Sequence, residues 1–158
     1  RGMSQITLRD ARKEDLETIV QFNMSLASET EDCALDYETV SKGVEAVLGN
    51  SMLGTYYIAE RDGEIAGQLM ITLEWSDWRN GFFHWIQSVY VRQEFRGKGV
   101  FRALYEHVID TAKNAPNVCG VRLYVERENT QAREDYDRVG IPSGGYDLRE
   151  LDWGRPLV

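Results

Sequence analysis

A short stretch rich in glycine and basic residues is the part of the sequence that most directly suggests chemistry. It runs Arg96-Gly97-Lys98-Gly99, with Arg102 close behind, between an extended aromatic segment and a segment with helical apolar spacing. Glycines let a backbone turn tightly and present its N–H groups to a ligand, and a helix N-terminus leaves about four N–H groups unsatisfied. The stretch therefore predicts a phosphate or diphosphate site, although a tight turn without a ligand also accounts for two glycines.

The spacing of these glycines differs from that of two familiar phosphate-binding motifs. The P-loop needs GxxxxGK[ST], and the dinucleotide-binding fingerprint needs GxGxxG after the first strand. Neither spacing occurs here. A protein that binds nucleotide phosphates is therefore retained only as a third interpretation of the loop.

The six residues from Arg96 to Phe101, RGKGVF, resemble the (Arg/Gln)-x-x-Gly-x-(Gly/Ala) signature of the GNAT superfamily of N-acetyltransferases, which follows the fourth strand and opens the third helix. Phe101 departs from the small last residue, so it either packs into the core or reshapes the edge of the phosphate site. A second segment resembles the family's L-x-V-x-x-x-N-x-x-A-x-x-x-Y-x-x-x-G pattern at the same spacing. Its matching residues are Leu123, Val125, Asn129, Ala132, Tyr136 and Gly140.

The resemblance extends over nearly the whole chain, from Ile6 to about Trp153. The segments 75–78 and 86–91, followed by the RGKG loop at 96–99, look most like small-amine acetyltransferases of the polyamine and diamine type. The resemblance therefore implies an enzyme that moves the acetyl group of acetyl-CoA directly to a primary amine of a small molecule, with no covalent enzyme intermediate. The alternatives are an acetyltransferase acting on protein lysines or N-termini, and a non-catalytic sensor that binds acyl-CoA.

The resemblance also implies which residues hold acetyl-CoA. In the family the fourth strand bulges and splays from the fifth. A backbone N–H exposed at the bulge faces the thioester carbonyl. The resemblance implies that this N–H belongs to Val89 here. Preorganised donors of this kind are each worth about 3 kcal/mol. Asn129 is expected to cap its helix and to contact the pantetheine arm. The cofactor-binding set is Val89, Tyr90, Val91, Arg96, Gly97, Lys98, Gly99, Val100, Phe101, Asn129 and Tyr136.

Tyr136 is the predicted general acid, because its counterpart in the family donates a proton toward the coenzyme sulfur. A phenol with a reference pKa of about 10 is still protonated at neutral pH, and a thiolate with a reference pKa of about 8.5 gains by accepting a proton. Packing at the edge of the core is the other role open to this tyrosine.

The general base is left open between Glu74 and His84, acting through water. An alkylamine with a reference pKa of about 10.4 must lose a proton before it attacks. Some family members place a carboxylate on the fourth strand, where this sequence has Gln87 and Ser88. His84 is alternatively a buried, hydrogen-bonded aromatic residue.

Acidic and aromatic side chains are the candidates for binding the amine. Glu29 and Glu31 lie in an acidic stretch after the first helix and would attract a cation. Trp75 and Trp78 flank a strand turn and would attract a cation through their rings, a contact worth about 0.5–2 kcal/mol. Aromatic residues on strands also commonly fill cores. No metal site is expected.

The elements that position these residues follow from periodicity and turn signals, and they alternate strands with helices. Strands are predicted over 5–9, 56–60, 64–75, 82–91, 118–125 and 146–153, and helices over 14–27, 99–113, 130–138 and between Asp36 and Gly49. The acidic stretch 28–32 is predicted as a loop. Strict alternation over 82–91 puts Trp85, Gln87, Val89 and Val91 on one face of the sheet and His84, Ile86 and Tyr90 on the other.

This order predicts an α/β fold with a mixed sheet. The resemblance implies mostly antiparallel N-terminal strands, a parallel pair splayed at the cofactor site, and helices on both faces. With 158 residues, the chain fits one domain over 3–158, and Arg1-Gly2 are taken as an extension outside the fold. A homodimer supported by the aromatic strands and 146–153 is left open.

Net charge and cysteine content limit the classes of partner and the compartment that we expect. The formal net charge is −8, which disfavours nucleic acid and suits a cationic or neutral substrate. Cys33 and Cys119 lack CxxC spacing, and neither a signal peptide nor a run of about 18 apolar residues is seen. The expectation is a cytoplasmic protein without membrane or nucleic-acid partners.

Overall fold

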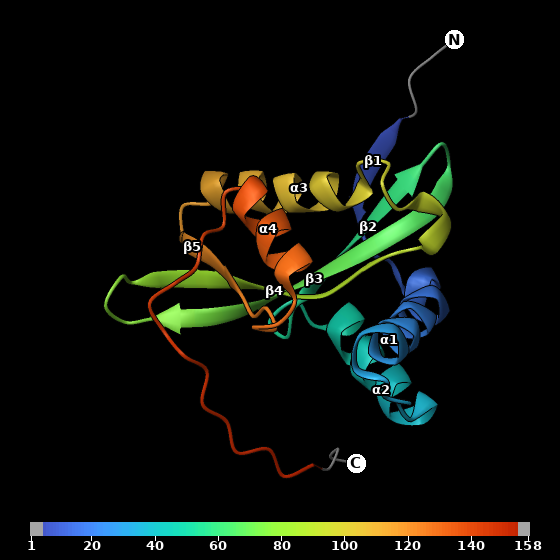
Figure 1. Ribbon diagram of the computed structural model, residues 1–158, viewed down its shortest axis with the longest axis horizontal. Helices are drawn as coiled ribbons and strands as arrows, with labels where there is room; N and C mark the ends of the chain where they lie inside the picture. The colour runs from blue at the N-terminus through green and yellow to red at the C-terminus, as the bar shows by residue number, and fades with distance from the viewer. Residues whose placement is uncertain (1–4, 155–158) are drawn as a thin grey trace. The chain divides into compact units, whose positions relative to one another are not determined.

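The computed structural model describes residues 5–154 as two units, which divide between Tyr124 and Val125 (Figure 1). The ends of the predicted domain 3–158, and the extension Arg1-Gly2, lie outside the described residues. A single domain over that range stays a prediction.

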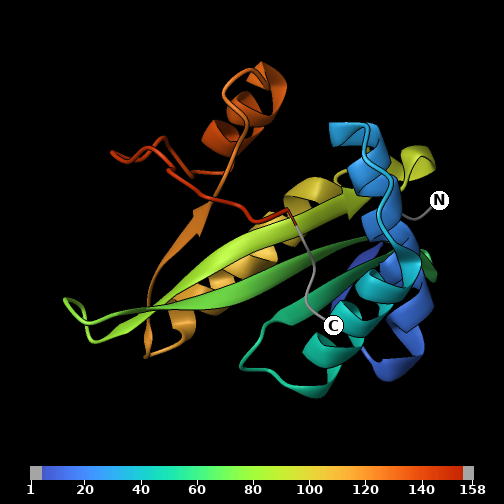
Figure 2. The same cartoon turned by 90° about the horizontal axis from the view of Figure 1, so that it is seen from below.

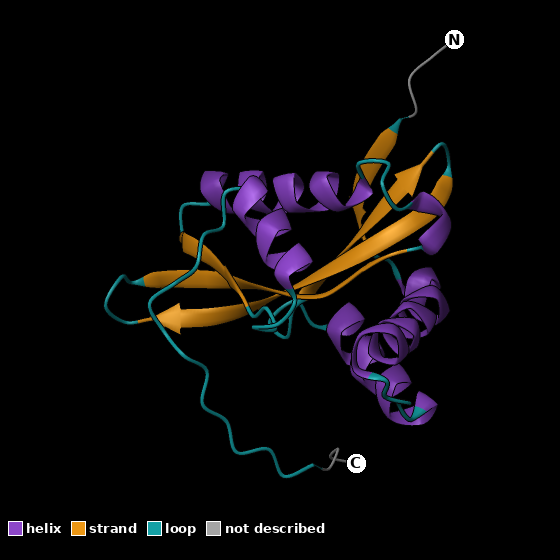
Figure 3. Ribbon diagram, viewed as in Figure 1, coloured by secondary structure: helices purple, strands orange, loops and turns teal. Residues whose placement is uncertain are grey.

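The first unit is built on a five-stranded mixed sheet, drawn in orange in Figure 3. Its strands are β1 (Ile6–Asp10), β2 (Thr55–Arg61), β3 (Glu64–Ser76), β4 (Gly81–Val91) and β5 (Val118–Leu123). They lie in the order β1-β2-β3-β4-β5, antiparallel except for the parallel pair β4–β5. The predicted mixed sheet with one parallel pair is confirmed.

Helices cover both faces of this sheet, as predicted (Figures 1 and 2). Short 3-10 turns, η1 (Lys13–Asp15) and η2 (Gln93–Phe95), precede the helices α1 (Leu16–Glu31) and α3 (Val100–Asn114), and α2 (Tyr37–Gly49) follows α1. The helices α1 and α2 pack on one face through Ile19, Val20, Val44, Tyr56 and Ile58. Helix α3 lies on the other face and buries Leu104, Tyr105 and Val108.

Local signals account for several boundaries. The Asp36 side chain accepts a hydrogen bond from the Thr39 N–H at 2.9 Å and caps α2. Asp62 and Gly63 both have positive φ, 52° and 86°, which is the backbone of a two-residue turn between twisted strands. The predicted hairpin between β2 and β3 is therefore confirmed.

The first helix is longer than predicted. The stretch 28–31, expected as a loop, continues α1 to Glu31, and the Thr30 hydroxyl donates to the Leu26 carbonyl at 2.7 Å. Acidic residues without proline or glycine do not stop a helix by themselves. The helix ends where Asp32 adopts a left-handed conformation with φ 48°.

The second unit contains α4 (Thr130–Arg138). The predicted cap is confirmed, because the Asn129 side chain accepts from the Ala132 N–H at 3.0 Å, and Gly140, with φ 87°, follows the helix. The predicted strand over 146–153 is wrong, since no strand is present in the described part of this unit. None of the described residues of α4 is buried, so the unit offers no core for the apolar side chains of this segment to pack against.

Among the described residues, the helices are all too short or too polar to cross a bilayer.

Candidate active site

A bulge in β4 marks the candidate site. Gln68 of β3 pairs with Tyr90, whereas Met70, two residues on, pairs with Gln87, so β4 carries one extra residue in between. Ser88 lies in this bulge with φ 51°. The pairing of β4 with β5 ends at Ile86, and the stretch Gln87–Val91 continues without β5. The predicted bulge and splay of the fourth strand are therefore both present.

The direction of the backbone N–H groups beyond the bulge follows from one hydrogen bond. The Arg92 N–H donates to the Ala66 carbonyl at 2.8 Å and therefore points toward β3. N–H groups alternate in direction along an extended strand, so those of Val91 and Val89 point away from β3, toward the side from which β5 diverges. This arrangement suits the predicted role of Val89.

The bulge also reverses the alternation of side chains. Ile86 pairs with Ile71, and Val91 pairs with Gly67, four residues away on the same face of β3. Val89 and Val91 therefore lie on the sheet face covered by α3, together with His84 and Ile86. Tyr90 lies on the face covered by α1, together with Trp85 and Gln87. The predicted split of β4 into two faces is wrong beyond Gln87, because a bulge adds one residue and shifts the period of two.

A buried polar network holds the bulge from β3 and α1. Gln68 is fully buried, and its side-chain amide donates to the Ser88 carbonyl at 3.1 Å and to the Asn23 side chain at 2.8 Å. Asn23 in turn donates to the Tyr56 hydroxyl at 3.2 Å, and burial raises the pKa of Tyr56. Sequence reasoning missed this network, although a glutamine inside the apolar run of β3 was the available signal.

The glycine-rich loop leads from β4 into α3. Gly97 and Gly99 have φ of 74° and 87°, conformations that glycine adopts without strain. Gly99 stands at the N-cap, and no side chain of the described chain caps α3. The first hydrogen bond of the helix runs from the Ala103 N–H to the Gly99 carbonyl at 3.0 Å, so the preceding N–H groups have no partner within the helix. A Cβ on Gly97 would meet no atom within 4 Å, so no other described part of the chain packs against that side of the loop.

Phe101 belongs to this first turn and is half-buried. Its ring packs against that of Tyr105 with centroids 4.4 Å apart. Tyr105 is fully buried, so the large residue in the last motif position is anchored on the core side of the helix.

Neither candidate base lies at the bulge. His84 is four residues from Ser88 along β4, about 13 Å at the rise of a strand. Glu74 pairs with Phe83 and lies farther away, on the opposite sheet face from His84. Its carboxylate accepts from Trp85 Nε1 at 2.6 Å and from Arg122 Nη1 at 2.9 Å. Burial lowers the pKa of His84, and its Nδ1 is buried without a partner among the described residues, so this imidazole is neutral at pH 7.

Comparison with known proteins identifies the family. Residues 16–141 match the model of the acetyltransferase (GNAT) family. The chain belongs to the GNAT acetyltransferase family. It is accordingly an acetyltransferase of a family that uses acetyl-CoA as the acetyl donor. The space beside Gly97, the uncapped helix and the splayed strand fit that donor. None of the curated proteins compared with the chain matches it.

Solved structures agree with this assignment. The chain is 42% identical to a possible acetyltransferase from Clostridium difficile 630, with a TM-score of 0.89, over 93% of this chain and 97% of that one. An aminoglycoside N-acetyltransferase in complex with CoA shares the fold at 17% identity, with a TM-score of 0.78 and 97% of each chain covered. A predicted acetyltransferase with acetyl-CoA from Clostridium acetobutylicum does so at 19% identity, with a TM-score of 0.75 and coverage of 94% and 96%.

The structure of this GNAT protein separates the predicted amine-binding residues. Glu29 lies near the end of α1 and accepts from the Tyr90 hydroxyl at 2.6 Å, next to the bulge. Glu31 is the exposed last residue of the same helix. Trp75 is seven residues along β3 from Gln68, about 23 Å at the rise of a strand, and Trp78 lies beyond it in the turn, 88% exposed. The acidic and aromatic candidates therefore do not form one pocket.

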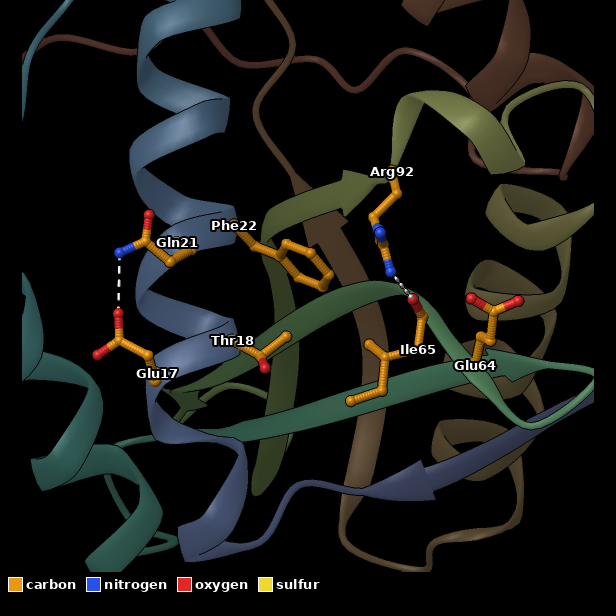
Figure 4. Close-up of a pocket in the computed structure, with 7 residues that line it drawn as sticks. All are labelled: Glu17, Thr18, Gln21, Phe22, Glu64, Ile65 and Arg92. Carbon is orange, nitrogen blue, oxygen red and sulfur yellow. Dashed lines mark hydrogen bonds between the residues drawn. The ribbon is translucent and has the colours of Figure 1, made fainter.

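Two surface hollows flank α1. The larger, of about 540 Å³, lies between α1 and the ends of β3 and β4, where Arg92 donates to the Ile65 carbonyl (Figure 4). None of the predicted site residues lines it. The smaller, of about 280 Å³, surrounds the connection from α1 to α2 and includes Asp32 and Cys33.

Tyr136 and Asn129 belong to the second unit. Tyr136 is half-buried on α4, and Asn129 caps that helix. Their roles toward acetyl-CoA stay predictions of the motif.

Proposed function

We propose that this chain transfers the acetyl group of acetyl-CoA to the primary amine of a small molecule. The observation that carries the proposal is the bulge at Ser88, which leaves the end of β4 without β5 immediately before the glycine-rich loop and the uncapped α3. Backbone N–H groups are thereby presented for a carbonyl and for a diphosphate within one short stretch of chain.

Acetyl-CoA supplies an acetyl group activated as a thioester. The residues proposed to hold it are the loop Arg96–Gly99, the first turn of α3, and the strand segment Val89–Val91, with Asn129 from the second unit. The Val89 N–H, fixed in direction by the bulge, is proposed to stabilise the negative charge that develops on the carbonyl oxygen. This stabilisation is proposed to be preorganised, because the Gln68 side chain of β3 donates a hydrogen bond to the Ser88 carbonyl and holds the bulge in place.

Proton transfers are assigned to side chains. Tyr136 is proposed to donate a proton to the departing sulfur. His84, neutral at pH 7, is the better proposed base. Because it lies about 13 Å along β4 from the bulge, it is proposed to act through a chain of several water molecules. Both oxygens of Glu74 are engaged by Trp85 and Arg122, so this carboxylate is proposed to fix the local structure.

Small cationic amines fit the acidic end of α1. The smaller hollow lies at that end. Glu29 of the same helix does not line the hollow, but it accepts a hydrogen bond from Tyr90 on the strand that carries Val89 and Val91. Trp75 and Trp78 lie too far along β3 to share a small acceptor with Glu29.

A thiol-release assay with acetyl-CoA tests the proposal. The acceptor panel holds free diamines and polyamines, amino acids, and lysine-containing and N-terminal peptides. We expect release with small amines above the hydrolysis background. Release only with peptides would favour a protein acetyltransferase, and coenzyme binding without release on any acceptor would favour a sensor. Competition by ATP as strong as that by coenzyme A would favour a nucleotide-phosphate binder.

Oligomeric state is a separate proposal. A homodimer is testable by light scattering, and the exposed segment 146–153 is not a strand that could extend a sheet in this structure.

A further inference from the structure

The side chain of Arg96, the first residue of the glycine-rich loop, is held by the strand and by α1. Its Nε donates to the Val91 carbonyl at 2.9 Å, and one Nη donates to Glu29 Oε1 at 2.7 Å. Its guanidinium also lies 5.5 Å from the centre of the Tyr90 ring. The arginine predicted to meet a diphosphate is therefore bound to a carboxylate of the same protein.

The Glu29 carboxylate is held by two donors from different segments. Besides Arg96, the Tyr90 hydroxyl donates to Oε2 at 2.6 Å, and Tyr90 itself packs against Phe22 of α1. These two hydrogen bonds lower the pKa of Glu29, so it is ionised at neutral pH. If Arg96 left, Tyr90 would still hold the carboxylate in place.

The ion pair lies at the surface, where exchange of partners is feasible. The side chains of Arg96 and Glu29 are 45% and 43% exposed. An ion pair this exposed contributes less than about fivefold to an equilibrium. A diphosphate carries more charge than one carboxylate, and arginine binds phosphate oxygens well, so it can displace Glu29.

We propose that Glu29 is a positioning residue that competes with the diphosphate of coenzyme A for Arg96, so that coenzyme binding releases the Glu29 charge toward the amine. This inference rests on the proposed function. When Arg96 turns to the diphosphate, Glu29 keeps its bond from Tyr90 but loses its cation. Its negative charge is then unbalanced between α1 and β4, close in sequence to Glu31 and Asp32 at the end of the helix.

Linkage gives this exchange a functional consequence. If coenzyme A binding raises the affinity for a cationic amine, the amine must raise the affinity for coenzyme A by the same factor. The two ligands would then bind with positive cooperativity, through one arginine shared between two anions.

The test is calorimetric titration of coenzyme A and of pantetheine, which lacks the phosphates, into Glu29→Gln. The matched control is Glu94→Gln, which removes one carboxylate from another exposed pair, with Arg92, just before the loop. We expect Glu29→Gln to lower the Kd for coenzyme A about two- to fivefold relative to the control, because one competitor is gone. Pantetheine affinity should not change.

Two further results decide between competition and simple electrostatics. Arg96→Gln should weaken coenzyme A binding, and Glu29→Gln should have no further effect in that background. An unchanged or higher Kd for coenzyme A in Glu29→Gln, with an unchanged melting temperature, would overturn the exchange. If the wild-type protein does not bind coenzyme A at all, the proposed function fails together with the exchange, whereas binding without tightening refutes the exchange alone.

Discussion

Gly67 is the position at which a single methyl group would disturb the candidate site most directly. It pairs with Val91 of β4. A Cβ added there would lie 2.6 Å from the Tyr90 carbonyl oxygen, 3.2 Å from Val91 Cα and 3.4 Å from Val100 Cγ1. Backbone atoms cannot turn aside as a flexible side chain does. Gly67→Ala must therefore push β4 away by about half an ångström, as overpacking of a core does.

Overpacking of this kind lowers the free energy of unfolding by about 1–3 kcal/mol. For a chain of this size, each kcal/mol lowers the melting temperature by about 2–4 °C. We therefore expect Gly67→Ala to melt roughly 2–12 °C below the wild type. Because the displaced residues carry the proposed N–H donors, kcat should also fall on the order of tenfold or more.

The matched control is the same substitution at Gly43. This glycine lies inside α2, and a Cβ there meets no atom within 4 Å. Alanine favours a helix interior over glycine by about 0.5–1 kcal/mol, so Gly43→Ala should raise the melting temperature by about 1–4 °C. Calorimetry and steady-state kinetics measure both variants. A Gly67→Ala protein that melts at or above the wild-type temperature and keeps its kcat would refute the argument.

Three further changes test separate features. Tyr136→Phe should reduce kcat far more than coenzyme affinity in thiol-release kinetics and titration, and an unchanged rate would assign Tyr136 to packing. Gln68→Leu should destabilise the fold by about 1–3 kcal/mol in urea unfolding, because the Ser88 carbonyl and Asn23 lose the donor that the buried Gln68 supplies. Asp15, nearly buried, accepts from Arg9 at 2.8 and 3.0 Å, and this bond lowers its pKa below 3.8. Asp15→Asn should therefore cost about 3 kcal/mol at pH 7. The difference from wild type should shrink as pH falls from about 4, where the carboxylate of the unfolded chain binds a proton, through the lower pKa of the folded state. A difference as large at pH 2 as at pH 7 would contradict this.

The sequence predicted the site best where the chemistry is local. The positive φ of Gly97 and Gly99 and the capping by Asn129 depend on residues within a few positions of each other. The family motifs also indicated that the fourth strand bulges. They did not show that Ser88 occupies the bulge, nor that Gln68, twenty residues away, binds it.

Assignments that needed contacts between distant residues were the weak ones. Glu29 was assigned to the amine from its charge alone, but it is paired with Arg96, 67 positions along the chain. Trp78 was assigned to the same amine from its aromatic ring alone, although the length of β3 separates it from Glu29. The last strand was predicted from local residue preferences and turn signals, and these supply no neighbouring strand to complete the hydrogen bonds.

By itself, the sequence determined the family, the order of most elements, the helix caps and the glycine-rich loop, because these depend on backbone preferences and on spacing within short segments. The tertiary structure decided which face of β4 each side chain takes beyond Ser88, which anion holds Arg96, and how far the aromatic residues lie from the site. The physical reason is that one extra residue in a strand, or one ion pair between distant segments, is fixed by the pairing of strands and the packing of α1, and local residue patterns do not carry that information.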